Sequence, residues 1–308
     1  MIDVTLLGTA ALMPLPQRAL AAALLTCGGH SILFDCGEGT QTAARKAGVS
    51  LMKTDVIALT HFHGDHIFGL PGLLQTMNVQ GRTERLFITG PKGLRRELGP
   101  ILKLVKCTMY DIELIALPAG GLALASLVPG WSGQARLSAF PTLHTVPSQG
   151  YCFTLGRAGA FLPERAKALG VPQEQWGRLQ HGGRVRVGKA VIRPEQVTGL
   201  PRKGLKCVFS GDTAACEPLI EAAREADLLI CEGTFGGEEH ADAAARHGHM
   251  TFSQAAGVAA RAGTKRLWLT HFSQTIDDPE AILPLAQAIF PNTVCGRDGL
   301  SETLRFEK

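Results

Sequence analysis

The sequence lacks any long uninterrupted apolar run. Its N-terminal part mixes apolar residues with Asp3, Pro14, Pro16 and Arg18, and the apolar stretch at 112–131 is broken by prolines and glycines. A membrane-spanning helix needs about 20 consecutive apolar residues, and a signal peptide needs an unbroken apolar core after a basic start. We therefore expect neither a signal peptide nor a membrane span.

The chain also lacks paired cysteines and a strong charge excess. Its 8 cysteines are scattered over 308 residues with no Cys-x-x-Cys pair, which favours reduced, buried thiols and a cytoplasmic location. The formal net charge of +4 is mild. It does not by itself indicate a nucleic-acid-binding protein, although it would not repel an anionic substrate. With 45% hydrophobic residues, the chain can bury a substantial core, so a folded enzyme is the expected class.

Three common catalytic signatures are missing as well. The sequence contains no Ser-His-Asp spacing, no Gly-x-x-x-x-Gly-Lys phosphate loop and no Gly-x-Gly-x-x-Gly dinucleotide motif. These absences argue against serine hydrolases, P-loop enzymes and dinucleotide-dependent enzymes.

What the sequence does contain is a dense histidine segment, Thr60-His61-Phe62-His63-Gly64-Asp65-His66. The chain has only 10 histidines, and three of them fall in this segment, directly after the apolar run at 56–59. Such a run predicts a buried strand, and α/β proteins place their sites at the C-terminal ends of strands. His61 and His63 would project to one side, whereas Asp65 and His66 follow the bend at Gly64. Imidazole and carboxylate are natural ligands of Zn²⁺ and related ions, so the segment predicts ligands for two metals.

Strands followed by helices recur along the chain, which predicts an α/β fold. We expect strands at 3–7, 20–26 and 31–35, helices ending near 47 and spanning about 69–77 and 92–104, and a run of strands over 112–155. Asp35 ends the third strand. It is either an outer partner of a metal-bound histidine or a helix-capping or turn carboxylate, and the sequence leaves both roles open.

Further candidate ligands also follow apolar strands. His144 follows a strand at 136–140, Asp212 follows one at 206–209, and His271 ends one at 266–270. A lone histidine is often structural, but His144 would give a hydrolytic metal its usual third protein ligand. The complete candidate set is His61, His63, Asp65, His66, His144, Asp212 and His271.

The candidate set divides into two metal sites. One metal would take His61, His63 and His144, the other would take Asp65, His66 and His271, and Asp212 would bridge them. Two ions so placed suit phosphodiester hydrolysis.

Two ionisable residues remain for proton transfer. Glu232 ends an apolar strand at 228–231, and His249 precedes an Ala-rich helix whose start fits a capping box formed by Thr251 and Gln254. We expect Glu232 and His249 to supply a proton to the leaving oxygen. The alternative is that either residue only orients a metal ligand.

Residues 157–205 are the least regular and most basic part of the chain. They predict a short arm or insertion on a single domain spanning 1–308, with helical stretches near 163–169 and 173–180 and a strand at 184–187. The arm is either a contact for a phosphate backbone or an exposed mobile loop.

These residues together resemble a known family. The segment His61-x-His63-x-Asp65-His66, followed in order by His144, Asp212 and His271, is similar to the metallo-β-lactamase superfamily. The surrounding segments, which include Phe34-Asp35-Cys36-Gly37-Glu38 and Gly90-Pro91-Lys92-Gly93, resemble ribonuclease Z. The resemblance extends over the whole chain. The resemblance implies an αβ/βα four-layer sandwich, two zinc ions or other divalent metals, and a homodimer. It also implies endonucleolytic removal of 3′ trailers from precursor tRNA, with Asp65 as both zinc ligand and proton acceptor.

Four segments depart from the pattern of that family, at residues 14–19, 171–178, 249–251 and 273–276. They concern the substrate more than the chemistry, and they leave two alternatives. One is a ribonuclease-Z-like hydrolase of small phosphodiesters or sulfate esters. The other is a non-catalytic RNA-binding relative that keeps metal for folding.

Overall fold

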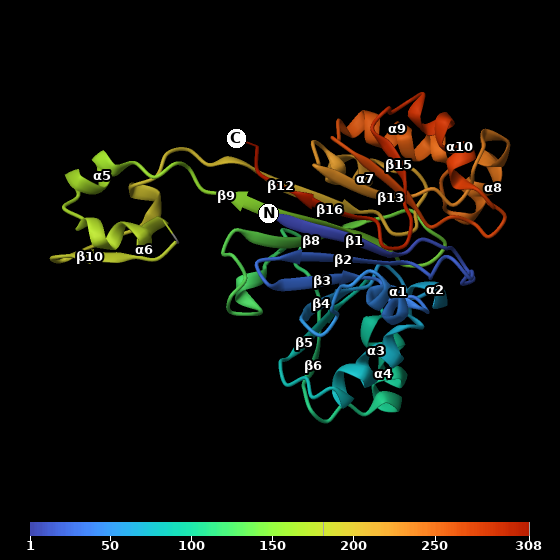
Figure 1. The fold of residues 1–308 in the computed structure, drawn as a ribbon, viewed down its shortest axis with the longest axis horizontal. Coiled ribbons are helices and arrows are strands. Elements are labelled where there is room, and N and C mark those ends of the chain that lie inside the picture. The colour runs from blue at the N-terminus through green and yellow to red at the C-terminus, as the bar shows by residue number, and fades with distance from the viewer. Residues whose placement is uncertain (181, 308) are drawn as a thin grey trace.

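Two mixed sheets lie face to face, with helices on their outer sides and a small lobe projecting from one end (Figure 1). The computed structural model describes residues 1–180 and 182–307. Each of the two large sheets has seven strands.

The first sheet comes almost entirely from the N-terminal part of the chain. Its order is β16 (Ser301–Leu304), β1 (Ile2–Gly8), β2 (Ala22–Cys27), β3 (His30–Phe34), β4 (Thr54–Ala58), β5 (Leu86–Thr89) and β6 (Ile112–Ile115). Strands β3 to β6 pair in parallel. The helices that follow these strands are α1 (Thr40–Lys46), α2 (Gly64–Ile67), α3 (Leu70–Val79) and α4 (Leu94–Val105).

The second sheet repeats this plan with the later strands. Its order is β15 (Thr293–Cys295), β14 (Leu267–Thr270), β13 (Leu228–Glu232), β12 (Arg202–Phe209), β9 (Gln149–Arg157), β8 (Ala135–Pro141) and β7 (Leu122–Ala123), the last leading into η1 (Leu124–Ser126). Strands β12 to β15 pair in parallel. The helices of this half are α7 (Glu217–Ala223), η4 (Glu238–His240), α8 (Ala241–His247), α9 (Phe252–Ala262) and α10 (Pro279–Gln287).

Side-chain alternation along the central strands explains the layers. In β4, Val56 and Ala58 join the core between the sheets, whereas Ile57 joins the core beneath the helices of the first half. In β13, Ile230 faces the core between the sheets and Leu229 faces the helices of the second half. Because successive residues of a strand point to opposite faces, strands buried on both sides read as continuous apolar runs. The order helix, sheet, sheet, helix confirms the four-layer sandwich.

Most elements begin and end within a few residues of the positions expected from the sequence. The capping box at the start of α9 is present, because Thr251 Oγ1 accepts from Gln254 N at 3.2 Å and the Gln254 side chain accepts from Thr251 N at 2.9 Å. In the described ranges, 1–180 and 182–307, no helix is both long enough and apolar enough to cross a membrane.

A separate small lobe lies between β9 and β12. It contains α5 (Pro163–Ala168), η2 (Gln173–Gln175), α6 (Trp176–Gln180), β10 (Val185–Val187), β11 (Ala190–Ile192) and η3 (Pro194–Gln196) around its own apolar core. Two extended segments connect it to the sandwich (Figure 1). These segments approach each other so closely that a Cβ on Gly159 would lie only 2.0 Å from the Gly199 carbonyl oxygen. Glycine is therefore required at this approach.

Candidate metal centre

The histidine segment leaves β4 and turns into the single-turn helix α2. His61 and His66 are fully buried, at 0% and 1% exposed, and Asp65 is 8% exposed. His63 occupies the N-cap position of α2 with extended backbone, and Asp65 and His66 lie within the turn. The change from strand to helix after His63 separates the four side chains into two directions, as the bend at Gly64 predicts.

The segment that carries Asp212 lies against the histidine segment. Asp212 follows β12 and is 3% exposed. The preceding residue, Gly211, has φ +61, and a Cβ there would lie 2.7 Å from the Thr60 side chain. A glycine permits both this left-handed backbone and the close approach. The two sheets thus bring their strand ends, and the ligands on them, to one place.

The structure brings all seven candidate ligands together. His61, His63, His144 and Asp212 each offer an atom within 4.8 Å of the others, and so do Asp65, His66 and His271. Nitrogen faces nitrogen within each set: His144 Nε2 lies 3.3 Å from His63 Nδ1, and His66 Nε2 lies 3.2 Å from His271 Nε2. A third group, Asp212, His249 and His271, meets the same distance limit, so the partition drawn from the sequence stays a prediction.

Asp212 lies between the two sets. Its Oδ2 is 3.7 Å from His61 Nε2 of one set, and 3.3 Å from both His66 Nε2 and His271 Nε2 of the other. A carboxylate in this position can contribute oxygen to both sets at once.

The residues fit divalent cations. Among the described residues, the buried atoms His61 Nε2 and Asp212 Oδ1 have no hydrogen-bond partner. Burial, together with the charge of His66, lowers the pKa of His61 to about 2, so this imidazole is neutral and its lone pair is free. Buried polar atoms without partners are rare and costly, and a bound cation would satisfy these two.

Electrostatics in the centre favour the ionised forms of Asp65 and Asp212. Burial alone would raise the pKa of Asp65, but the hydrogen bond to His271 and the charges of His66 and His271 hold it well below the usual range. Burial disfavours the charged form of His66, yet the carboxylates of Asp212 and Asp35 raise its pKa well above the ordinary value. Since a metal ligand must be neutral imidazole, binding of a metal at His66 would release a proton.

Asp35 is an outer partner of the histidines. Its carboxylate accepts from His66 Nδ1 at 2.7 Å, from Thr60 N at 2.7 Å and from Thr60 Oγ1 at 2.8 Å. Helix α1 begins at Thr40 with Gly39 as N-cap, so the capping role that the sequence left open is wrong. By holding the proton of His66 on Nδ1, Asp35 directs Nε2 towards the other ligands.

Glu232 and His249 form a hydrogen-bonded pair beside the ligands. His249 Nδ1 donates to Glu232 Oε1 at 2.8 Å. Burial opposes a charged imidazole, but the Glu232 carboxylate outweighs it and raises the pKa of His249 to about 9. Glu232 is 1% exposed and also accepts from the backbone N–H groups of Thr213 at 2.7 Å and Met250 at 3.1 Å. Its lone pairs are committed to these donors, and the catalytic role expected for it from the sequence stays a prediction.

Three groups around the site were not found from the sequence. Gly248 accepts from His144 Nδ1 at 3.0 Å through its carbonyl, Leu12 N donates to Asp65 Oδ2 at 2.8 Å, and Thr234 contacts Glu232 through its hydroxyl. The first two act through the backbone, so their side chains give no signal. Thr234 lies two residues after a strand-end carboxylate, and that spacing was the only signal available.

Comparison with known proteins agrees with this geometry. A family model described as beta-lactamase superfamily domain matches residues 172–272, and one described as Anti-Pycsar protein Apyc1 matches residues 2–101. Ribonuclease Z of Lachnoclostridium phytofermentans is 40% identical over 310 residues, covering 100% of this chain and 99% of that protein. Ribonuclease Z of Agathobacter rectalis is 41% identical over 308 residues, covering 100% of both chains. The chain belongs to the ribonuclease Z family.

Ribonuclease Z relatives of known structure share the architecture. The crystal structure of human tRNase Z, short form, superposes with a TM-score of 0.67 at 28% identity, covering 99% of this chain and 100% of the human one. The metallo-β-lactamase fold implied by the sequence is confirmed. This member of the family is a metal-dependent hydrolase.

Proposed function

We propose that the protein is an endoribonuclease that removes 3′ trailers from precursor tRNA with two zinc ions. The observation that carries the proposal is the meeting of two complete ligand sets at Asp212, in a chain that aligns over its whole length with proteins named Ribonuclease Z. Neither the altered segments nor the mild net charge removes any part of this centre.

The two ions would be held as the ligands are grouped. His61, His63 and His144 would hold one, Asp65, His66 and His271 would hold the other, and Asp212 would reach both. Bound there, they would supply an acidified water and stabilise the charge that develops on the phosphodiester. Histidine and carboxylate ligands suit Zn²⁺, and other divalent ions are possible with the same donors.

Two side chains would handle protons. Asp65, whose pKa is held below the usual range, would be the proton acceptor; its Oδ2 lies within the second ligand set, 3.4 Å from His271 Nε2. His249 would be the proton donor for the leaving oxygen, because its pKa of about 9 keeps it charged at neutral pH. Since Nδ1 is committed to Glu232, the proton on Nε2 is the one available. Glu232, expected as a donor, is better assigned the role of orienting His249.

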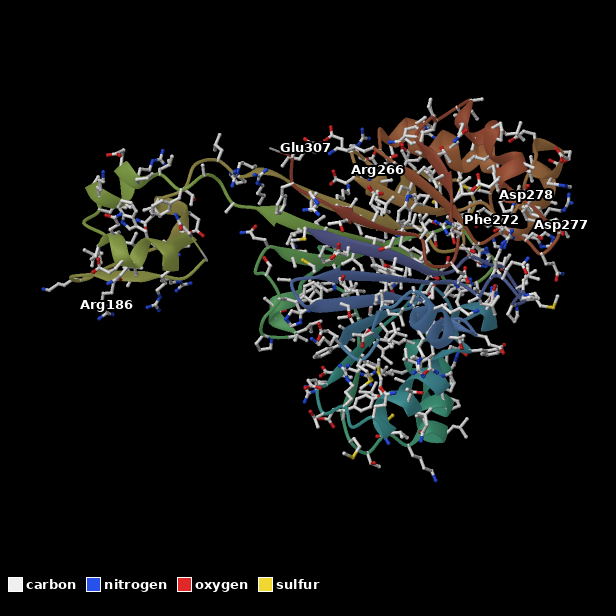
Figure 2. All side chains as sticks on the ribbon, viewed as in Figure 1. Arg186, Arg266, Phe272, Asp277, Asp278 and Glu307 are labelled. Carbon is white, nitrogen blue, oxygen red and sulfur yellow. The ribbon has the colours of Figure 1, made fainter. Side chains whose placement is uncertain are left out.

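The lobe is the proposed contact for the tRNA backbone. It carries seven basic residues, namely Arg165, Lys167, Arg178, Arg184, Arg186, Lys189 and Arg193. Figure 2 shows Arg186 on the lobe and Phe272, the neighbour of His271, in the part of the sandwich away from the lobe. A substrate that touches both regions must be long, as a tRNA is, and phosphate contacts position it without reading sequence.

Three further assignments belong to the proposal. The chain forms a single domain that bears the lobe as an arm, two chains form a homodimer, and the protein is cytoplasmic. The resemblance supports the dimer, and the eight free cysteines, mostly buried, suit a reducing compartment. Sedimentation of the purified protein would test the dimer: a mass near twice 32.8 kDa supports it, and a monomer at micromolar concentration contradicts it.

The deciding experiment is cleavage of a 3′-extended precursor tRNA by zinc-loaded protein, with products sized on a gel. We expect a single cut near the end of the acceptor stem, and none with Asp65→Ala. An intact trailer under conditions where the protein carries both ions would contradict the proposal.

A small phosphodiester is the second candidate substrate, and one contact favours it. Two of the altered segments touch: Arg18 donates to the carbonyls of Ile276 at 3.3 Å and Asp277 at 3.2 Å, and its guanidinium lies over the Phe272 ring. Two of the four departures from the family therefore meet beside Phe272, the neighbour of His271. Hydrolysis of a chromogenic phosphodiester without any tRNA cleavage would select this candidate.

A further inference from the structure

Thr234 lies at the junction between the metal ligands and the Glu232–His249 pair. It follows β13 and is 4% exposed. Its Oγ1 is 2.6 Å from Glu232 Oε2, 2.9 Å from His271 Nδ1 and 3.3 Å from His249 Nδ1. No other residue touches all three of these side chains through one atom in the hydrogen bonds of the described chain.

The chemistry of a hydroxyl group fixes the direction of these bonds. A threonine hydroxyl has one proton to donate and two lone pairs that accept. An ionised carboxylate only accepts, so Thr234 donates to Glu232. Its oxygen then accepts the Nδ1 proton of His271. That places the proton of a neutral His271 on Nδ1, so in the metal-bound protein the lone pair of Nε2, which lies 3.3 Å from Asp212 and 3.4 Å from Asp65, would face the cation.

His249 joins the same chain from the other end. Its Nδ1 is closer to Glu232 Oε1, at 2.8 Å, than to Thr234 Oγ1, at 3.3 Å. The carboxylate therefore holds Thr234 on one oxygen and His249 on the other. The result is a continuous series of hydrogen bonds from His271 through Thr234 and Glu232 to His249.

The first half of the molecule contains a matching series. His61 Nδ1 lies 3.1 Å from Thr60 Oγ1, which donates to Asp35 Oδ2 at 2.8 Å, and Asp35 accepts from His66. In both halves a buried threonine links a histidine ligand to a strand-end carboxylate. The recurrence indicates that the threonine is part of the centre rather than an incidental neighbour.

We propose that Thr234 is a positioning residue that couples the metal held by His271 to the orientation of His249. The proposal rests on the proposed function for the roles of these two histidines. When the hydroxyl is removed, His271 loses the acceptor that fixes its ring, and Glu232 loses one of the donors that fix its carboxylate. Metal affinity at one site and proton donation should therefore weaken together.

The test is Thr234→Val, which keeps the shape of the side chain and removes the hydroxyl. Zinc binding is measured by competition with a chromogenic chelator. We expect one ion to bind as in wild type and the other about 10- to 100-fold more weakly, the usual effect of losing an outer-shell partner. At saturating zinc, kcat for precursor tRNA should fall while KM is unchanged, and Thr234→Ser should restore both zinc affinity and kcat.

Thr54→Val is the matched control. Thr54 is also fully buried, and its hydroxyl has no hydrogen-bond partner within the described chain. The Thr54→Val protein should bind both ions with wild-type affinity.

Two results would overturn the proposal. One is a Thr234→Val protein that binds both ions with wild-type affinity; the other is a Thr234→Ser protein as defective as Thr234→Val, which would assign the effect to packing. Circular dichroism and melting of the chelated proteins check folding, and Thr234→Ala replaces the valine variant if that one does not fold. Zinc affinity needs no tRNA, so a wild-type protein that fails to cleave tRNA would refute the proposed function and leave this inference standing.

Discussion

Buried polar atoms without partners are the residue-scale sign that the centre holds cations. His61 Nε2 and Asp212 Oδ1 are two of the few such atoms among the described residues, and each would cost about 1–3 kcal/mol if nothing satisfied it. Bound zinc would remove that cost and add binding free energy that the unfolded chain lacks.

Metal removal should therefore destabilise the fold. At free zinc 1,000-fold above Kd, binding contributes about 4 kcal/mol, which corresponds to a fall in melting temperature on the order of 10 °C for a chain of this size. Differential scanning fluorimetry with and without a chelator measures the fall. Asp212→Asn should reduce the difference between the two curves, whereas identical curves for wild-type protein would argue against bound metal.

The pH dependence of cleavage follows from His249. The donor is the protonated imidazole, so kcat should fall as pH rises through its pKa of about 9. Glu232→Gln removes the carboxylate that raises this pKa and leaves the burial that lowers it, so the alkaline limb should move to lower pH. A pH profile of kcat measures the shift. The control is Glu217→Gln, which removes an exposed carboxylate on α7. An unmoved limb in Glu232→Gln would exclude His249 as the donor.

At the scale of elements, the C-terminal end of α8 orients a ligand. Gly248 has φ +67, and a Cβ there would lie 2.9 Å from His144 Cα and 3.1 Å from its Nδ1. Gly263, the C-cap of α9, has φ +63 and open space around it. Alanine costs about 1–2 kcal/mol at either position because of the left-handed backbone, but only Gly248→Ala should displace His144.

A comparison of the two alanine variants separates strain from ligand displacement. In chelator, denaturant unfolding should show a loss of about 1–2 kcal/mol in Gly263→Ala and at least as large a loss in Gly248→Ala. Zinc content after dialysis should fall in Gly248→Ala and stay normal in Gly263→Ala. Equal zinc content in the two proteins would show that the Gly248 turn does not position His144.

The sequence predicted those parts of the site that depend on one strand. His61, Asp212, Glu232 and His271 each follow an apolar run, and parallel strands of buried sheets end at a common edge. Asp35 was ambiguous because a capping carboxylate and an outer metal partner have the same local sequence. Thr234 and Gly248 were missed because the histidines that they contact lie on other elements, and only the packed structure brings them together.

At the scale of the whole molecule, the lobe lies apart from the metal centre. Its core is separate, and the connecting segments meet at Gly159 and Gly199. We therefore expect that a short glycine-rich turn between β9 and β12 can replace residues 160–198 without disturbing the sandwich.

This deletion should affect tRNA and leave small substrates unchanged. Without the basic residues of the lobe, KM for precursor tRNA should rise by about 10-fold or more, and its dependence on salt should weaken because fewer counterions are released. The rate on a chromogenic phosphodiester, measured in parallel, is the control. Unchanged KM and salt dependence for tRNA would show that the lobe has no role in binding.

The most direct test of the account as a whole is cleavage of 3′-extended precursor tRNA as zinc is added stepwise to metal-free protein. The two ligand sets around Asp212 predict that cleavage near the acceptor-stem end appears with the second equivalent of zinc and is absent at one. Full activity at one equivalent would contradict the two-metal centre, and no cleavage at two equivalents would contradict the proposed substrate.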